Sequence, residues 1–144
     1  MKKIIIFVLV LFILPLMTAC SKTVSVQKPD IQKRFEPVTE LKIETLKEGN
    51  GKVVVEGSNV AAHYTGMFVD GKTFDTSDGR DPIHFTVGGG QVIAGWDQGF
   101  IGMKEGEERR LSIPSTLGYG ADDFGPIPGG STLIFEVELV EIMN

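Results

Sequence analysis

The carboxyl-terminal segment of the chain alternates between apolar and acidic side chains. Apolar residues occupy every second position from Leu133 through Phe135 to Leu139, and Glu136 and Glu138 stand between them. Successive side chains of a β-strand point to opposite faces, so this alternation predicts a strand with one buried and one solvent-exposed face. Strands of this kind are typical of antiparallel sheets that are covered on one side.

Further strand signals lie upstream. Apolar or small residues alternate over residues 60–68, and Leu111 and Ile113 repeat the pattern. Asn50-Gly51 and Asp70-Gly71 are dipeptides that tolerate the positive φ angles of a type I′ turn, so we expect a hairpin at each. The 18 glycines of the 144 residues suit a fold with many chain reversals.

Only one stretch has the spacing of a helix. Val92, Ile93, Trp96 and Phe100 follow i, i+1, i+4, i+8 spacing, and Gly102 is placed to end the helix. Its apolar stripe must be buried against the sheet. We therefore expect an α+β fold over residues 41–144, with an antiparallel β-sheet wrapped around one short α-helix.

Charge and cysteine content exclude several classes of function. Residues 41–144 carry 8 basic and 16 acidic residues, which disfavours binding to nucleic acid. Cys20 is the only cysteine, so no intrachain disulfide or cysteine-cluster metal site is possible. Neither a metal nor an organic cofactor is expected.

The amino-terminal residues are typical of an export signal. Lys2 and Lys3 precede an apolar run, residues 4–17, which is shorter than the roughly 20 residues of a spanning helix. We therefore assign residues 1–19 to a signal peptide, with an uncleaved membrane anchor as the alternative. Residues 16–20, with the sequence LMTAC, resemble the lipobox of bacterial lipoproteins, although Met17 stands where leucine is favoured.

The lipobox resemblance implies that Cys20 carries the lipid and attaches the chain to a membrane. Several acyl chains anchor a protein stably, whereas one holds it weakly. The location implied is the exported side of a bacterial cell envelope, in the periplasm. In a host with two membranes, Ser21 after the cysteine is similar to lipoproteins sorted to the outer membrane. Residues 20–40 are then the lipidated cysteine and a flexible tether, with a short helix over residues 30–35 as the alternative.

Five segments in order resemble one protein family. They are AHYTG at 62–66, GKTFDTS at 71–77, QVIAGW at 91–96, LGYG at 117–120 and STLIFEVEL at 131–139. Together they are similar to the FKBP-type (macrolide-binding immunophilin) peptidyl-prolyl cis–trans isomerase domain. The resemblance covers residues 41–143, and it implies the fold that the periodicity predicts.

The resemblance also implies a site in which tryptophan forms the floor of a cavity between helix and sheet and other aromatic rings line its walls. A tyrosine hydroxyl and a backbone amide, those of Tyr119 and Ile93, would bond substrate carbonyls. The site residues carried over to this chain are Tyr64, Phe74, Asp75, Val92, Ile93, Trp96, Tyr119, Ile127 and Phe135. The chain departs from the family at Ile83, where many members have an aromatic residue, and in shorter loops at 76–81 and 121–129.

The activity implied is isomerisation of X–Pro bonds during the folding of exported proteins, without a covalent intermediate. Desolvation in an aromatic pocket favours the twisted amide. Catalysis of this kind needs no nucleophile, metal or cofactor. Proline-containing polypeptides are the expected partners, macrolides the expected inhibitors, and the domain is expected to be a monomer. The alternatives are a binding module that acts as a chaperone or adaptor, and a lipid- or small-molecule-binding lipoprotein.

Individual residues also have simpler interpretations. A tryptophan on a lone helix is commonly a core residue, and Asp75 would serve as a polar strand end or as a wall partner of Tyr64. His63 and His84 have no carboxylate at metal-binding spacing, and Ser115 has no His/Asp arrangement for nucleophilic catalysis.

Overall fold

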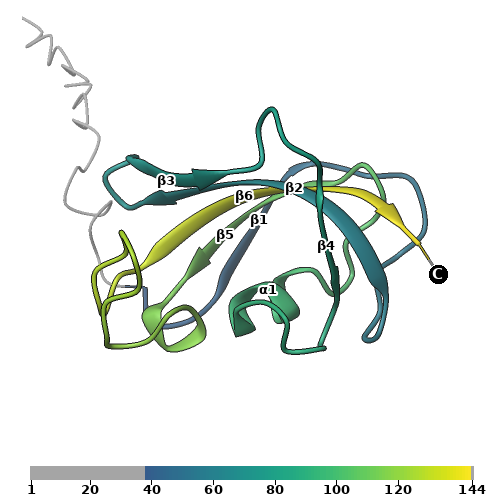
Figure 1. Ribbon diagram of the computed structural model, residues 1–144. Coiled ribbons are helices and arrows are strands. Elements are labelled where there is room, and N and C mark those ends of the chain that lie inside the picture. Colours follow the sequence, from purple (N-terminus) through teal and green to yellow (C-terminus); the bar gives the residue numbers. More distant parts are fainter. Residues whose placement is uncertain (1–37, 144) are drawn as a thin grey trace, which may run out of the picture.

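The computed structural model describes residues 38–143, which fold into one six-stranded sheet that curves over a short helix (Figure 1). The predicted signal peptide, Cys20 and the tether up to residue 37 lie outside the described residues. The elements in chain order are β1 (Lys42–Lys47), β2 (Asn59–Phe68), β3 (Thr73–Thr76), β4 (Ile83–Thr86), α1 (Ala94–Gly99), β5 (Glu108–Ile113), the 3₁₀ helix η2 (Ser115–Leu117) and β6 (Leu133–Ile142). The predicted fold class, α+β, is confirmed.

All strand pairs of the sheet are antiparallel. The order is β1-β5-β6-β2-β3, and β4 pairs with the other end of the same edge of β2. The strands β3 and β4 are therefore joined by a loop over residues 77–82 that stands away from the sheet (Figure 1). This arrangement leaves the loop beside the middle of β2, where Tyr64 lies.

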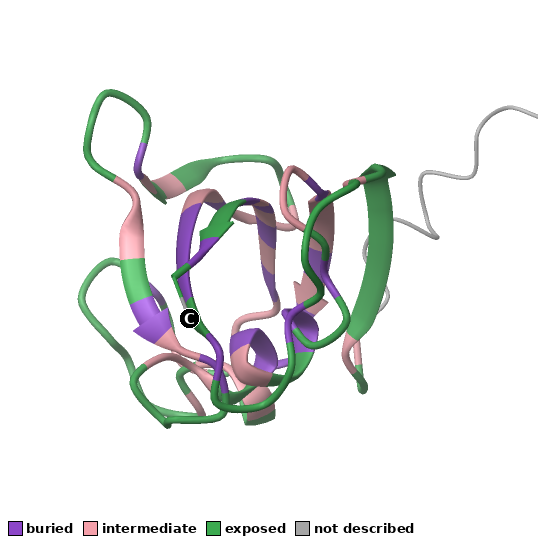
Figure 2. Ribbon diagram, turned by 90° about the vertical axis from the view of Figure 1, so that its right-hand side faces the viewer, coloured by how far each residue is buried: buried purple, intermediate pink, exposed green. Residues whose placement is uncertain are grey.

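The predicted alternation is present in the strands that carry the core. In β6 the side chains of Leu133, Phe135, Val137 and Leu139 are buried, whereas Glu136 is only partly covered on the other face. The buried parts of the domain gather on α1 and on the strands that face it (Figure 2). The core thus lies between the helix and one face of the sheet.

One of the two hairpin predictions is confirmed. β2 and β3 are joined by residues 69–72, and the Gly71 N–H donates to the Phe68 carbonyl oxygen at 2.9 Å. Gly71 has a φ of +88°, and no non-glycine residue from 38 to 143 has a positive φ. The turn is therefore not of type I′, which requires positive φ at both central residues; it fits a type I turn followed by a left-handed glycine.

The predicted hairpin at Asn50-Gly51 is wrong. β1 pairs with β5 rather than with β2, and Gly51 does not have a positive φ. The N–H groups of Asn50 and Gly51 donate instead to the Glu105 carbonyl oxygen, at 3.2 and 3.4 Å. A long-range contact with the loop before β5 therefore takes the place of a local turn.

The helix is shorter than its sequence pattern suggests. Ile93 has extended backbone angles, φ −61° and ψ 147°, so it precedes α1 together with Val92. α1 packs closely on the sheet because glycine faces it: a Cβ atom at Gly95 would lie 2.5 Å from Ile113 Cγ2, and one at Gly99 would lie 2.7 Å from Leu111 Cδ1.

A buried ion pair fixes the carboxyl end of α1. Arg109 Nε lies 2.5 Å from Glu107 Oε1; the Glu107 side chain is almost fully covered, and that of Arg109 is mostly covered. The Arg109 guanidinium also donates to the carbonyl oxygens of Gly99 and Ile101, at 2.9 and 3.1 Å. The last carbonyls of a helix have no partner within it, so this side chain supplies one.

Candidate active site

A cavity of about 190 Å³ opens between α1 and the sheet. Its walls come from β2, β3, β4 and β6, its floor from α1, and its rim from the segments before α1 and after η2. The residues that line it are Tyr64, Phe74, Asp75, Ile83, Gln91, Val92, Ile93, Trp96, Tyr119 and Phe135. The structure therefore brings together every site residue named from the sequence except Ile127.

Ile127 is not among the residues that line this cavity. Its side chain is buried in the core, and its backbone exchanges two hydrogen bonds with Phe124, at 2.9 and 3.0 Å. The shortened loop over residues 121–129 thus closes on itself in a tight turn. Ile127 anchors that turn to the core.

Trp96 forms the floor within a cluster of aromatic rings. Its ring centroid lies 5.2 Å from that of Tyr64 and 5.3 Å from that of Phe135, and both rings are nearly perpendicular to it. Phe85 and Phe100 approach from the core side, at 5.6 and 5.4 Å. Edge-to-face contacts of this kind are favourable, and they hold the indole in one orientation.

The Trp96 indole nitrogen is buried, and it has no hydrogen-bond partner in residues 38–143. A buried donor without a partner costs about 1–3 kcal/mol. The unpartnered N–H thus belongs to the residue that forms the aromatic floor of the cavity.

Gly66 makes room for the aromatic walls. A Cβ atom there would lie 2.7 Å from the Phe74 ring and 2.8 Å from the Phe135 ring. These two rings meet edge to face, with centroids 5.6 Å apart. The glycine of the AHYTG segment therefore lets both rings close over β2.

One wall of the cavity is polar. The Tyr64 hydroxyl donates to Asp75 Oδ2 at 2.5 Å, as predicted for a wall partner, and Arg80 pairs with Asp75 Oδ1 at 2.7 Å. The hydrogen bond from Tyr64 is the main cause that lowers the pKa of Asp75, and Arg80 adds to it. Burial, followed by the bond to Asp75, raises the pKa of Tyr64. Asp75 is therefore an ionised acceptor at neutral pH.

Two hydrogen-bond donors at the cavity are free to bind a ligand. Neither the Ile93 N–H nor the Tyr119 hydroxyl makes a hydrogen bond to any residue from 38 to 143. Burial and the charge of Asp75 raise the pKa of Tyr119, so its hydroxyl stays protonated and can donate. The Tyr119 ring stacks on Phe124 at 4.5 Å, with 15° between the planes.

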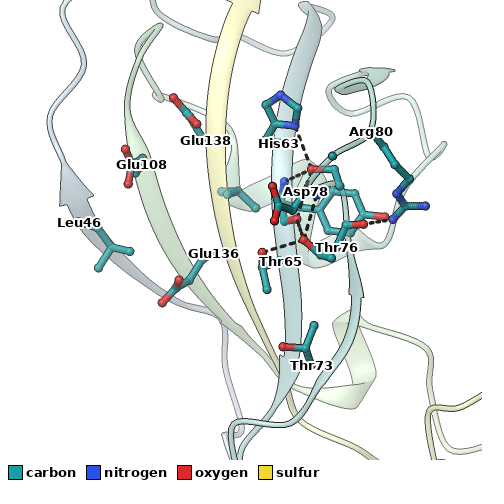
Figure 3. A pocket seen from close by; sticks show the side chains of 14 residues that line it. Leu46, His63, Thr65, Thr73, Thr76, Asp78, Arg80, Glu108, Glu136 and Glu138 are labelled. Atoms are coloured by element: carbon teal, nitrogen blue, oxygen red, sulfur yellow. Dashed lines mark hydrogen bonds between the residues drawn. The ribbon is translucent and has the colours of Figure 1, made fainter.

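A second, wider hollow of about 740 Å³ lies on the face of the sheet turned away from α1 (Figure 3). It is bordered by polar groups such as Glu136, Glu138 and Thr65, and by His63, whose Nδ1 lies 3.0 Å from Ser77 Oγ. No three histidine, cysteine or acidic side chains in residues 38–143 are grouped to hold a metal ion. The cavity between α1 and the sheet is lined mainly by aromatic and aliphatic side chains, so it is the better candidate for binding an apolar ring.

Several residues near the site were not identified from the sequence. Arg80 and Gln91 hold loops by hydrogen bonds, Phe124 stacks on Tyr119, and Asp97 binds the loop before α1. An exposed charged or aromatic loop residue has no periodic signal, so contacts alone reveal these roles. None of the helices in residues 38–143 is long and apolar enough to cross a membrane.

Together, the fold and the cavity define a small α+β domain that encloses an aromatic pocket with free hydrogen-bond donors at its rim. The model of the family described as FKBP-type peptidyl-prolyl cis-trans isomerase matches residues 51–140, and the chain belongs to this family. It is thus a peptidyl-prolyl cis–trans isomerase of the FKBP type.

Relatives of known sequence agree with this assignment. The chain is 55% identical over 102 residues to the FK506-binding protein of Neisseria meningitidis serogroup B, covering 69% of this chain and 94% of that protein. It is 52% identical over 105 residues to FK506-binding protein 1A of Neurospora crassa, covering 71% and 88%.

Solved structures are similar as well. The crystal structure of AtFKBP13 has a TM-score of 0.67 and 36% identity, covering 71% of this chain and 92% of that one. FkpA from Escherichia coli has a TM-score of 0.66 and 37% identity, covering 72% of this chain and 48% of FkpA.

Proposed function

We propose that the cavity above Trp96 binds the proline ring of an X–Pro segment and lowers the barrier to rotation about its amide bond. The observation that carries this proposal is the pair of free donors, the Tyr119 hydroxyl and the Ile93 N–H, at the rim of an aromatic cavity. Donors placed there can hold substrate carbonyls while the ring is buried.

The physical reason lies in the amide itself. Its partial double bond gives a rotation barrier of about 18–20 kcal/mol, and charge separation with a negative oxygen stabilises the planar form. Water favours that polar form, so transfer into a cavity walled by Tyr64, Phe74 and Phe135 favours the twisted one. Rotation breaks no covalent bond, and catalysis requires only tighter binding of the twisted state.

The test uses the full chain, purified in detergent, and a short X–Pro peptide whose cis and trans forms are resolved by NMR. Uncatalysed exchange takes tens to hundreds of seconds, and substoichiometric protein should shorten it. A chain that binds the peptide and leaves the exchange rate unchanged would support a binding module instead. Heat-denatured protein is the control.

We also propose that the same cavity binds macrolides. The support is the family and its relatives, several of which are named FK506-binding proteins. FK506 should then inhibit the exchange of the X–Pro peptide in a competitive manner. Inhibition that higher peptide concentrations do not relieve would place the macrolide elsewhere.

We further propose that the chain is a lipoprotein attached through Cys20 on the exported side of a bacterial envelope, and that its substrates are exported polypeptides. The support is the apolar run, the lipobox-like residues 16–20 and the single cysteine. Cells grown with a labelled fatty acid should incorporate label into the wild type and not into Cys20→Ala. Fractionation of the envelope would then show which membrane holds the chain.

A further inference from the structure

Asp97 follows Trp96 in α1, and its carboxylate binds the loop that precedes the helix. The Gly88 N–H donates to Oδ1 at 2.9 Å, and the Gly90 N–H donates to Oδ2 at 3.1 Å. Each carboxylate oxygen therefore holds one backbone amide. Hydrogen bonds to an ionised acceptor are stronger than those between neutral groups.

The loop bound by Asp97 has high intrinsic freedom. Residues 88–90 are three consecutive glycines, and Gly88 and Gly90 have φ of +79° and +66°. Glycine loses more conformational freedom on folding than any other residue. Two further bonds act within the segment, from the Gly89 N–H to the Thr86 carbonyl oxygen at 3.0 Å and from the Thr86 N–H to Gln91 Oε1 at 2.8 Å. The bonds to Asp97 are the ones that join the loop to α1.

The same loop leads directly into the cavity wall. Val92 and Ile93 follow it, both line the cavity, and the Ile93 N–H is one of the two free donors. The backbone at Ile93 is still extended, so the loop as well as the helix sets the position of this amide.

We infer that Asp97 is a positioning residue for prolyl isomerisation, because it holds the triglycine loop in the one arrangement that presents Val92 and the Ile93 N–H to the substrate. This role rests on the proposed function of the cavity. If the site is ordered only part of the time, the apparent Kd of each ligand is its intrinsic Kd divided by the ordered fraction, so binding is weaker. Loss of the two bonds therefore raises KM rather than removing a catalytic group.

The test compares the full-length wild type with Asp97→Asn. Asparagine offers one acceptor oxygen and turns an NH₂ group toward the other glycine amide. We expect the KM for an X–Pro peptide to rise about five- to tenfold, with a smaller fall in kcat. The backbone order parameters of Val92 and Ile93 should fall in the same variant. Asp97→Glu, which keeps both acceptor oxygens, should lie between the two in KM.

Glu105 provides a matched control. Its carboxylate also accepts two backbone bonds, from the N–H groups of Ile142 at 2.9 Å and Lys52 at 3.2 Å, and it does not line the cavity. Glu105→Gln should lower the free energy of unfolding and leave KM at the wild-type value.

If Asp97→Asn behaves like Glu105→Gln, with KM and the order parameters of Val92 and Ile93 unchanged, the positioning role is overturned. If the wild type itself does not accelerate exchange, the proposed function fails. The two failures are therefore distinguishable.

Discussion

The hydroxyl of Tyr64 and the carboxylate of Asp75 meet at 2.5 Å on the wall of the cavity, and Arg80 closes the carboxylate from the other side at 2.7 Å. The bond joins β2 to β3, and Arg80 links both to the loop between β3 and β4. The polar wall and the loop beside it are thus held by a single carboxylate.

This contact predicts a dependence of stability on acid pH. The pKa of Asp75 is lowered in the folded domain, first by the Tyr64 hydrogen bond. The ionised carboxylate therefore adds to the free energy of unfolding, and this stabilisation is fully present above the pKa that Asp75 has in the unfolded chain. It is lost as the pH falls below about 4, through the folded pKa. Asp75 is half exposed, so we expect about 1 kcal/mol or less. Urea unfolding across this pH range should show a smaller loss in Asp75→Asn than in the wild type; the loss that remains comes from other carboxylates, such as Glu105, whose pKa is lowered first by the Ile142 N–H.

The buried pair of Glu107 and Arg109 should matter far more. Glu107→Gln leaves the Arg109 guanidinium buried without its counter-ion, which costs about 3–5 kcal/mol in buried pairs. Urea denaturation measures this change in the free energy of unfolding. The exposed pair of Lys47 and Glu108 is the control, and Lys47→Ala should change stability little. Equal effects of the two substitutions would contradict the account of how α1 is capped.

Gly99→Ala tests the close packing of α1 on the sheet. Alanine is favoured over glycine inside a helix by about 1 kcal/mol, so a helix in open space would be stabilised. Here the added Cβ would lie 2.7 Å from Leu111 Cδ1, and we expect a net loss of about 1–3 kcal/mol. Thermal and urea unfolding give the value.

A double variant isolates the cause of that loss. Leu111→Val shortens the side chain that Cβ would meet, so Gly99→Ala should cost less in its presence than alone. The exposed helix residue Gln98 is the control, because Gln98→Ala should be nearly neutral. If the effects of Gly99→Ala and Leu111→Val on the free energy of unfolding were strictly additive, the contact between the new Cβ and Leu111 would not be the cause of the loss.

Tyr119→Phe separates activity from stability. The hydroxyl bonds to no residue in the described part of the chain, so its removal should leave the free energy of unfolding unchanged. A neutral hydrogen bond contributes about 1 kcal/mol, so kcat/KM for an X–Pro peptide should fall about fivefold. Peptide exchange measured by NMR, beside urea unfolding of the same protein, checks both parts. Unchanged kcat/KM would show that the hydroxyl does not reach the substrate.

The strands and their buried faces could be predicted from the sequence because each covered strand repeats its pattern locally. Leu133 to Leu139 show this most clearly. The partner of β1 could not be predicted in this way, since Asn50-Gly51 carries a local turn signal and the contact with Glu105 is far away in the chain. Val92 and Ile93 have helical spacing, yet they precede α1 in a segment tied to the triglycine loop.

The aromatic surface of the site was expected from the family resemblance, and the structure gathers it around Trp96. What the sequence did not reveal are the groups that hold this surface in place. Asp97, Arg80 and Phe124 act through contacts between loops, and loops have no repeating spacing that would single out such residues. Ile127 was also expected at the pocket surface; it is not among the residues that line the cavity, and its backbone closes the turn with Phe124.

Trp96 is the only tryptophan in the chain, and it forms the floor of the cavity. The protein therefore carries one intrinsic indole fluorophore, located where a ligand would sit. A change in its emission on addition of a peptide or macrolide would have no background from other tryptophans. Titration of the unlabelled protein can thus measure occupancy of the pocket directly, with the chain acting as its own optical sensor.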